Sequence, residues 1–211
     1  MEFKVIVDAR ARAAAGCAVV GVYDKGELGA ATRPLDAQLG GLIARLHSAG
    51  DFAAKLGETL LLPHPQGAAA QRVLLTGLGP RATFGYKQYR KALQSSAQAV
   101  LKTGSADAIV YLALEDVPAM ETAYRARAVA EVFSGQIYKI PDLKTAPKAK
   151  PPKLASLTVA ADNARSAKAM TTGVKVGAAM REQRLRLLER CNVLGLAYTP
   201  YCSMDLRVVY Q

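Results

Sequence analysis

The amino-acid sequence predicts an α/β fold in which helices pack against a central sheet. Some segments carry apolar residues at alternate positions or in short β-branched runs, others carry them at helical spacing, and the two kinds alternate along most of the chain. The length of 211 residues suffices for one sizeable core. No apolar run approaches the roughly 18 residues that cross a bilayer, so we expect no membrane segment.

The first half of the chain is expected to form strands around one long helix. The expected strands are short runs that end at turn residues, namely Phe3–Val7, Ala18–Tyr23, Leu56–Leu62 and Arg72–Thr76. The leucines and the isoleucine between residues 35 and 48 fall on one helical face. We predict a single helix there, with Thr32 as its cap, Pro34 in its first turn and Gly50 as its stop.

The second half continues the alternation. Helices are expected over Phe84–Leu101, which Gly104 terminates, over Pro118–Phe133 with Tyr124 on its apolar face, and from Asp162 or Asn163 to about Leu188; strands are expected over Asp107–Leu114 and Leu154–Ala160. Residues Lys139–Lys153 are rich in Lys and Pro and are interpreted as a linker. Residues 191–211 have no clear period.

Cysteine and histidine give no sign of a metal site. The cysteines Cys17, Cys191 and Cys202 form no C-x-x-C pair and are interpreted as reduced thiols. His47 and His64 are isolated from them and from each other. We interpret His47 as a residue at a helix C-terminus and His64, between two prolines, as an exposed turn residue.

The segment Gly77-Leu-Gly-Pro-Arg-Ala82 imitates a dinucleotide-binding turn, because it follows an expected strand and precedes an expected helix. The acidic ribose ligand of that motif belongs about 20 residues further on, whereas the next expected strand ends at Glu115. Pro80 also removes a backbone donor from the loop. A tight turn between strand and helix is the favoured interpretation, and nucleotide binding is the alternative.

Several segments, taken in order, resemble the opening part of bacterial M17 leucyl aminopeptidases, also called cytosol aminopeptidases. They are Cys17-Ala-Val-Val-Gly-Val-Tyr23, Gly50–Leu62, Arg72–Gly79, Phe84–Tyr89, Tyr124–Val129 and Thr172–Glu182, and the resemblance spans roughly Glu2 to Glu182. It implies the N-terminal domain of that family. The fold it implies is a three-layer, macro-domain-like α/β fold with a mixed central sheet flanked by helices.

The residues that carry the family's chemistry are absent from this sequence. Where the resemblance predicts Gly-Asn-x-Pro-x-Asn, the chain has Gln183-Arg-Leu-Arg-Leu-Leu-Glu-Arg190, and the signatures G-K-G-x-x-F-D-T-G-G and N-T-D-A-E-G-R-L do not occur. The resemblance implies zinc, manganese or magnesium in the full-length family. For this chain we expect truncation before the catalytic domain, no catalytic residue, no metal ligand, no cofactor and no activity by itself.

The resemblance divides the chain into three parts: a macro-like domain over residues 1–160, a helix over 161–190 that would lead to the catalytic domain, and an atypical tail over 191–211. It implies a catalytic domain of the family, or intact homologous subunits, as partners in the cytoplasm. In this interpretation the chain is an accessory domain. A plain protein-interaction module is one alternative.

DNA binding is the other alternative, because the chain is basic and some bacterial members of the resembled family also bind DNA. The net charge is +11 and the pI is about 9.7. The candidate phosphate contacts are Lys87, Arg90, Lys91, Lys102, Lys144, Lys148, Lys150 and Lys153. A solvated helix face and a solvated linker explain the same residues. Aromatic residues make up only 6% of the chain and are not interleaved with basic ones, so base stacking is not indicated.

Overall fold

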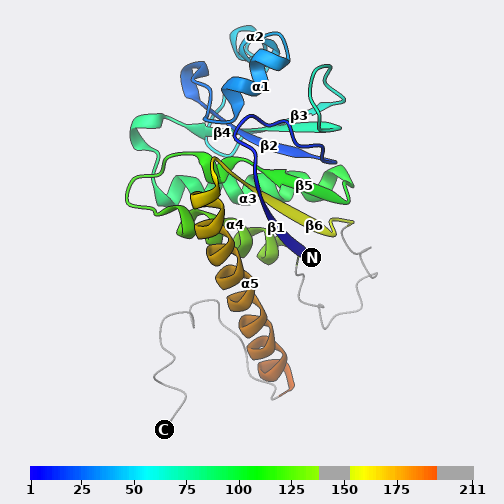
Figure 1. Cartoon of the computed structure of the whole chain (residues 1–211), viewed down its shortest axis with the longest axis vertical. Coiled ribbons are helices and arrows are strands. Elements are labelled where there is room, and N and C mark those ends of the chain that lie inside the picture. Colours follow the sequence, from blue (N-terminus) through cyan, green and yellow to red (C-terminus); the bar gives the residue numbers. More distant parts are fainter. Residues whose placement is uncertain (138–152, 194–211) are drawn as a thin grey trace.

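The computed structural model describes residues 1–137 and 153–193, with the backbone alone for residue 181 and for residues 184–193. Its centre is a sheet of six strands in the order β1-β6-β5-β2-β4-β3 (Figure 1). The strands are β1 (Glu2–Val7), β2 (Ala18–Tyr23), β3 (Thr59–Pro63), β4 (Arg72–Gly79), β5 (Asp107–Val110) and β6 (Ser156–Ala161). All neighbouring pairs are parallel except β3 with β4. The expected mixed sheet is confirmed.

Helices cover both faces of this sheet, which gives the expected three layers. They are α1 (Thr32–Gln38) and α2 (Leu42–Ala49) on one face, and α3 (Tyr86–Thr103), α4 (Thr122–Ile137) and α5 (Ala164–Val193) on the other. Each face has its own apolar cluster. Strand β2 contributes side chains to both clusters, because Val19 points into the cluster under α3 to α5 and Val20 points into the cluster under α1 and α2.

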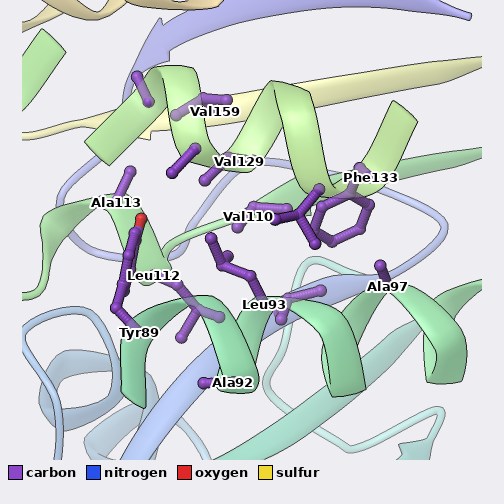
Figure 2. Close-up of a cluster of buried hydrophobic side chains, with 14 of the residues drawn as sticks. Tyr89, Ala92, Leu93, Ala97, Val110, Leu112, Ala113, Val129, Phe133 and Val159 are labelled. Atoms are coloured by element: carbon purple, nitrogen blue, oxygen red, sulfur yellow. The ribbon is translucent and has the colours of Figure 1, made fainter. Parts of the chain in front are cut away.

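The larger cluster lies between the sheet and helices α3 and α4. Figure 2 shows Leu93 of α3 and Phe133 of α4 meeting Val110 of β5, and all three side chains are almost fully buried. Ala92 and Ala97 line the inner side of α3, where small side chains let the helix approach the sheet. Helical spacing in the sequence identified this face of α3 correctly.

The single helix expected over residues 35–48 is wrong, since the segment forms two helices. Gly40 and Gly41 separate them with φ angles of 61° and 76°, a left-handed conformation that ends a helix and that glycine adopts readily. Leu35 and Ile43 nevertheless bury in the same cluster. The apolar period therefore continued across a break that only the two adjacent glycines revealed.

Other boundaries also moved. The strand expected to reach Leu114 ends at Val110, and Leu112–Leu114 forms a 3-10 turn. The helix expected from Pro118 begins at Thr122. The cap of α5 is Asn163, whose Oδ1 accepts the N–H of Ser166 at 2.9 Å. Most of the expected linker, residues 139–152, lies outside the described residues, and the three-part division of the chain stays a prediction.

Helices α4 and α5 pack closely because α5 has glycine at the contact. A Cβ on Gly173 would lie 1.9 Å from the carbonyl oxygen of Ala123, and one on Gly177 would lie 2.7 Å from that of Arg127. Gly135 of α4 has no atom within 4 Å of the corresponding position. The spacing of four residues between Gly173 and Gly177 puts both on one side of α5, so this side is fixed against α4.

We expect Gly173→Ala to lower the free energy of unfolding by about 2 kcal/mol, because overpacking against a rigid backbone outweighs the better helix propensity of alanine. The matched control is Gly135→Ala, which should raise that free energy by about 0.5–1 kcal/mol. Urea denaturation followed by circular dichroism measures both. Changes of the same sign in the two variants would contradict the close contact between α4 and α5.

Candidate functional site

A pocket of about 270 Å³ lies at the carboxyl ends of the central strands. We call it the Glu115 pocket. Its lining comes from three loops and the start of α1: Leu28, Gly29 and Ala30 after β2 with Arg33 of α1, Arg81 after β4, and Leu114, Glu115 and Asp116 after β5. The loop after β2 leads to α1 on one face, whereas the other two lead to α3 and α4 on the opposite face. Ligands of open α/β sheets bind in such a crevice, where connections diverge at the carboxyl edge.

Glu115 lines the pocket and is only 3% exposed. The hydroxyl of Tyr23 donates to its Oε2 at 3.1 Å, and the backbone N–H of Ala30 donates to its Oε1 at 2.9 Å. Burial raises the pKa of Glu115 to about 7, against the lowering effect of these hydrogen bonds. The group therefore changes charge near neutral pH.

Glycine at position 29 allows the loop to close over this carboxyl group. A Cβ there would lie 2.2 Å from Oε1 of Glu115 and 2.6 Å from the carbonyl oxygen of Gly21. The N–H of Gly29 donates to that same carbonyl at 3.1 Å. The main chain of residues 28–30 is thus tied both to the end of β2 and to Glu115, which makes this wall of the pocket preorganised.

Two arginines stand beside this acid. Nη1 of Arg81 lies 2.5 Å from Oε1 of Glu27, and its guanidinium carbon lies 5.2 Å from the centre of the Tyr23 ring. Arg33 is exposed in the first turn of α1, and none of the ion pairs or side-chain hydrogen bonds found among the described residues includes its guanidinium group. The pocket therefore presents both signs of charge, with one cation free to meet a ligand.

A second surface feature lies on the helical face of the molecule. We call it the tyrosine patch, and its members are Tyr86, Tyr124, Val176 and Met180, each between 40% and 44% exposed. The ring centres of Tyr86 and Tyr124 are 6.0 Å apart. The sequence analysis placed Tyr124 on the apolar face of its helix. That placement is wrong, because Tyr124 points outward while Ala128 and Val132 of the same helix are buried.

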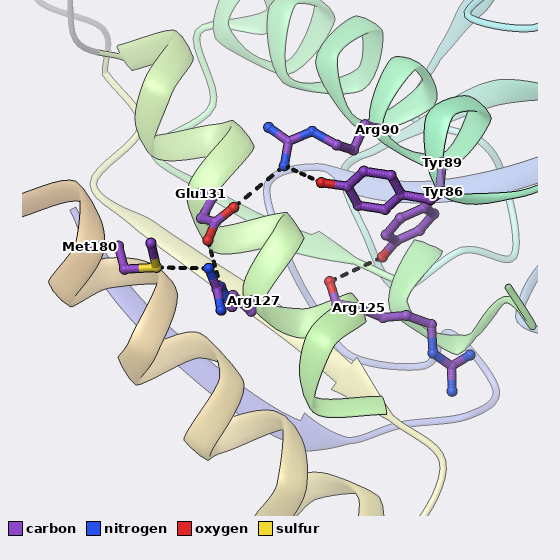
Figure 3. A network of polar contacts seen from close by, with 7 residues as sticks. All are labelled: Tyr86, Tyr89, Arg90, Arg125, Arg127, Glu131 and Met180. Carbon is purple, nitrogen blue, oxygen red and sulfur yellow. Dashed lines mark hydrogen bonds and ion pairs between the residues drawn. The ribbon is translucent and has the colours of Figure 1, made fainter. Parts of the chain in front are cut away.

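Ionic contacts hold the tyrosine patch together (Figure 3). Glu131 accepts from Nε of Arg127 at 2.6 Å and from Nη1 of Arg90 at 3.4 Å. Arg90 also donates to the hydroxyl of Tyr86 at 3.1 Å, and Nη2 of Arg127 lies 2.8 Å from Sδ of Met180. One carboxylate thus orients two arginines, which in turn brace the outward side chains of α3 and α5.

Comparison with known proteins decides the family. Residues 19–147 match the model of the N-terminal domain of the cytosol aminopeptidase family. The chain belongs to the cytosol aminopeptidase family. A probable cytosol aminopeptidase of Chromohalobacter salexigens is 37% identical to it over 207 residues, which are 97% of this chain and 40% of the relative. Across the most similar curated relatives, this chain spans 36% to 40% of their length.

Solved structures confirm the macro-domain-like fold of this family member. A tomato leucine aminopeptidase mutant has a TM-score of 0.63 and 19% identity, over 84% of this chain and 36% of that one. A Trypanosoma brucei macrodomain has a TM-score of 0.61 and 14% identity, over 82% of this chain and 67% of that one. At these identities the likeness concerns the fold alone.

The described part of this chain does not fit a metal centre. Within it, no group of three or more His, Cys, Asp or Glu side chains is placed to hold a metal ion. Nδ1 of His47 lies 2.9 Å from the carbonyl oxygen of Phe52, and His64 is exposed in a turn, as expected. Cys17 is fully buried, which raises the pKa of its thiol to about 12, and Cys191 and Cys202 carry no described side chain.

The segment that imitates a dinucleotide-binding turn is placed differently from that motif. Gly77 and Gly79 still belong to β4, and α3 begins only at Tyr86. A Cβ on Gly77 would lie 2.0 Å from the carbonyl oxygen of Lys55. This glycine therefore permits close approach of two backbone segments, and it does not sit at the helix N-terminus, where a pyrophosphate would bind.

The structure brings together three of the eight predicted phosphate contacts. Lys87, Lys91 and Lys102 are exposed on α3 and fall within about 60° of its circumference, at 100° per residue. Arg90 is turned toward α4 instead (Figure 3). Lys153 is exposed just before β6. The remaining three, Lys144, Lys148 and Lys150, lie outside the described residues.

The sequence analysis did not select Glu115 as a candidate site residue and treated it only as the end of a strand. A partial signal was present, since the expected strand Asp107–Leu114 would have put this acidic residue at the carboxyl edge of the sheet, where ligands bind; in the structure a 3-10 turn separates Glu115 from the end of β5. Membrane insertion has no candidate among the helices that the structure describes, because none is both long and apolar enough to cross a bilayer.

Titration of Glu115 should make the stability depend on pH. Its pKa rises from 4.5 to about 7 on folding, so the folded protein binds more protons than the unfolded chain between these values, and stability falls as the pH rises through that window. Compared with Glu115→Gln, whose amide does not titrate, the original protein should lose about 3 kcal/mol of unfolding free energy.

Urea denaturation of both proteins from below pH 4.5 to above pH 7 measures this difference, and the variant cancels the contributions of all other groups. A difference between the two proteins that stays constant with pH would contradict the burial of a titrating carboxyl group.

Proposed function

We propose that this chain is a non-catalytic accessory domain that works with the catalytic part of a metallo-aminopeptidase, an enzyme that removes N-terminal residues from peptides. One observation carries the proposal. The family model that matches is that of the N-terminal domain, and the chain spans only 36% to 40% of its curated relatives. The proposal assigns the chemistry to the part of those relatives that lies outside the match.

The donor groups of the chain agree with that assignment. Hydrolysis by two metal ions needs carboxylates fixed around both ions and an open position for water. The sequence has neither of the two signatures that supply such ligands in the resembled family. In this proposal zinc, manganese or magnesium is held by the catalytic part, and the assembly works in the cytosol, as the names of the relatives suggest.

The tyrosine patch is the surface we assign to contact with the catalytic part. Tyrosine, methionine and arginine are enriched at the centres of protein interfaces, and bracing by Glu131 lowers the cost of ordering them. Helix α5 extends well beyond the sheet in Figure 1 and carries Met180 on its way. In the proposal, the chain continues after α5 into the catalytic part, which would then lie on the side of the molecule that carries this patch.

A chimera tests the function. Residues 1–182 replace the matching segment of the Chromohalobacter salexigens relative, so that the catalytic part is covalently attached. We expect the chimera to hydrolyse leucine p-nitroanilide with added manganese, and this chain alone to give no rate above the blank.

Tyr86→Ala with Tyr124→Ala should shorten the half-life of the chimera at elevated temperature at least about tenfold, a typical loss for two interface tyrosines.

The matched control is Leu61→Ala, which removes a side chain of similar exposure from the edge strand β3. It should leave that half-life nearly unchanged. Robust metal-dependent turnover by this chain alone would overturn the accessory role. A chimera that stays inactive while the natural relative is active would also count against it. Equal effects of the tyrosine and leucine variants on the half-life would show that the tyrosine patch is not the interface.

DNA contact through α3 is the second candidate, and the stripe of Lys87, Lys91 and Lys102 favours it. Among the described residues these three ammonium groups enter no ion pair. Their spacing along one side of a helix suits a row of phosphates, and such contacts carry no sequence preference. Arg90 is not part of this candidate surface, because it is engaged with Glu131.

Changing the three stripe lysines to glutamine should weaken binding to duplex DNA and reduce the slope of log K against log salt by about 2–3, since each phosphate contact contributes nearly one unit. Fluorescence anisotropy at several salt concentrations measures the slope. The control changes Lys4, Lys55 and Lys168, which are exposed outside α3, and so alters the net charge equally. The same slope in both triple variants would mean that only the net charge matters and that the three lysines of α3 form no DNA-binding surface.

A further inference from the structure

We propose that the Glu115 pocket binds a free α-amino acid with an apolar side chain. The ligand carboxylate would meet the guanidinium groups of Arg33 and Arg81, and its ammonium group would meet the carboxyl groups of Glu115 and Asp116. The apolar side chain would lie against Leu28 and Leu114.

The signs of charge in the lining select a zwitterion. A simple anion would be attracted by the two arginines, but it would also face the carboxyl groups of Glu115 and Asp116 in the same lining. A simple cation would face the arginines. A ligand with both charges a few ångströms apart avoids both repulsions, and charge-assisted hydrogen bonds of this kind are the strong ones.

Glu115 has the acceptor capacity for such a ligand. An ionised carboxylate offers about four lone-pair sites, and the described contacts use one site on each oxygen, for the hydroxyl of Tyr23 and for the N–H of Ala30. Tyr23 belongs to β2, and the loop that holds Ala30 is tied to the carbonyl of Gly21 by the N–H of Gly29. The carboxyl group therefore keeps its orientation when no ligand is bound, which limits the loss of entropy on binding.

The volume sets the size of the ligand. Pockets for drug-sized molecules range over about 300–1,000 Å³, and the 270 Å³ of the Glu115 pocket lies just below that range. An amino acid of the size of leucine fits such a volume, whereas a dinucleotide exceeds it. Arg81 already stacks over Tyr23 and pairs with Glu27, so the wall it forms is in place before binding.

Free amino acids are also the products that the proposed aminopeptidase releases. That link rests on the proposed function, whereas the binding itself is a property of this chain alone. The test below uses the isolated chain and no peptidase activity. A failed chimera and a failed binding experiment are therefore separate outcomes.

The experiment is isothermal titration calorimetry of the full chain with L-leucine, supported by ligand-observed NMR. We expect saturable binding with a dissociation constant of about 1 mM or tighter. Two probes remove one charge each: leucinamide lacks the carboxylate, and 4-methylpentanoate lacks the ammonium group. Each should bind at least about tenfold more weakly than leucine, the usual loss for one charged hydrogen bond.

Two variants assign the charges to residues. Arg33→Met changes an exposed side chain and should weaken the binding of leucine at least about tenfold, while the affinity for leucinamide stays unchanged. Glu115→Gln keeps the shape of the buried group and should weaken the binding of leucine similarly, while the affinity for 4-methylpentanoate stays unchanged. A variant that only disturbs packing would weaken the binding of all three ligands, whichever charge they carry. Arg45→Met, an exposed arginine of α2 outside the pocket, is the control and should bind leucine as the original chain does.

Three results would overturn the proposal: no saturable binding of leucine up to its solubility limit, equal binding of leucine and both single-charge probes, or equal effects of Arg33→Met and Arg45→Met. Selective loss of leucine binding in the two pocket variants, with the control unchanged, would establish the site.

Discussion

The fold depends on the burial of strand β2 on both of its faces. All six of its residues are buried, and its neighbours β4 and β5 run parallel to it. Such a strand must have an apolar layer above and below, which is why the core divides into two clusters and why helices are needed on both sides. The packing against β2 is close at Gly21, because a Cβ there would lie 2.6 Å from Cδ1 of Leu78. The two helical layers follow from this burial, and the pocket lies at the carboxyl end of this central strand.

The same constraint explains the buried acid. The last residue of β2, Tyr23, is covered from both sides, and its hydroxyl needs a partner away from water. Glu115 supplies an acceptor, and it also ties Ala30 to the centre of the sheet. Burial of an ionisable group is unfavourable unless hydrogen bonds compensate it. The raised pKa of Glu115 indicates that two hydrogen bonds offset only part of that penalty, so the group remains receptive to a cationic ligand.

Much of the fold was accessible from the sequence, and the failures have physical causes. Strands such as Ala18–Tyr23 were found because burial on both faces produces an uninterrupted apolar run. The break between α1 and α2 was missed because Leu35 and Ile43 pack into one cluster on both sides of it. Tyr124 was misplaced since an aromatic residue at helical spacing looks like core when its outward neighbours are unknown. The position of Glu115 after an expected strand hinted at the carboxyl edge of the sheet, but its burial was not predictable, because its partners Tyr23 and Ala30 are far away in the sequence.

Helix α5 shows how one element serves two purposes through the size of its side chains. On the side facing α4, Gly173 and Gly177 bring the backbones together, so that orientation and register are fixed by contacts that tolerate no added atom. Val176 and Met180 remain exposed on the same helix, and Met180 meets Arg127 of α4. A rigid attachment on one side makes the exposed side a well-defined surface. Preorganisation of this kind, and not apolar area alone, is what would let a patch of four side chains act as the interface proposed for it.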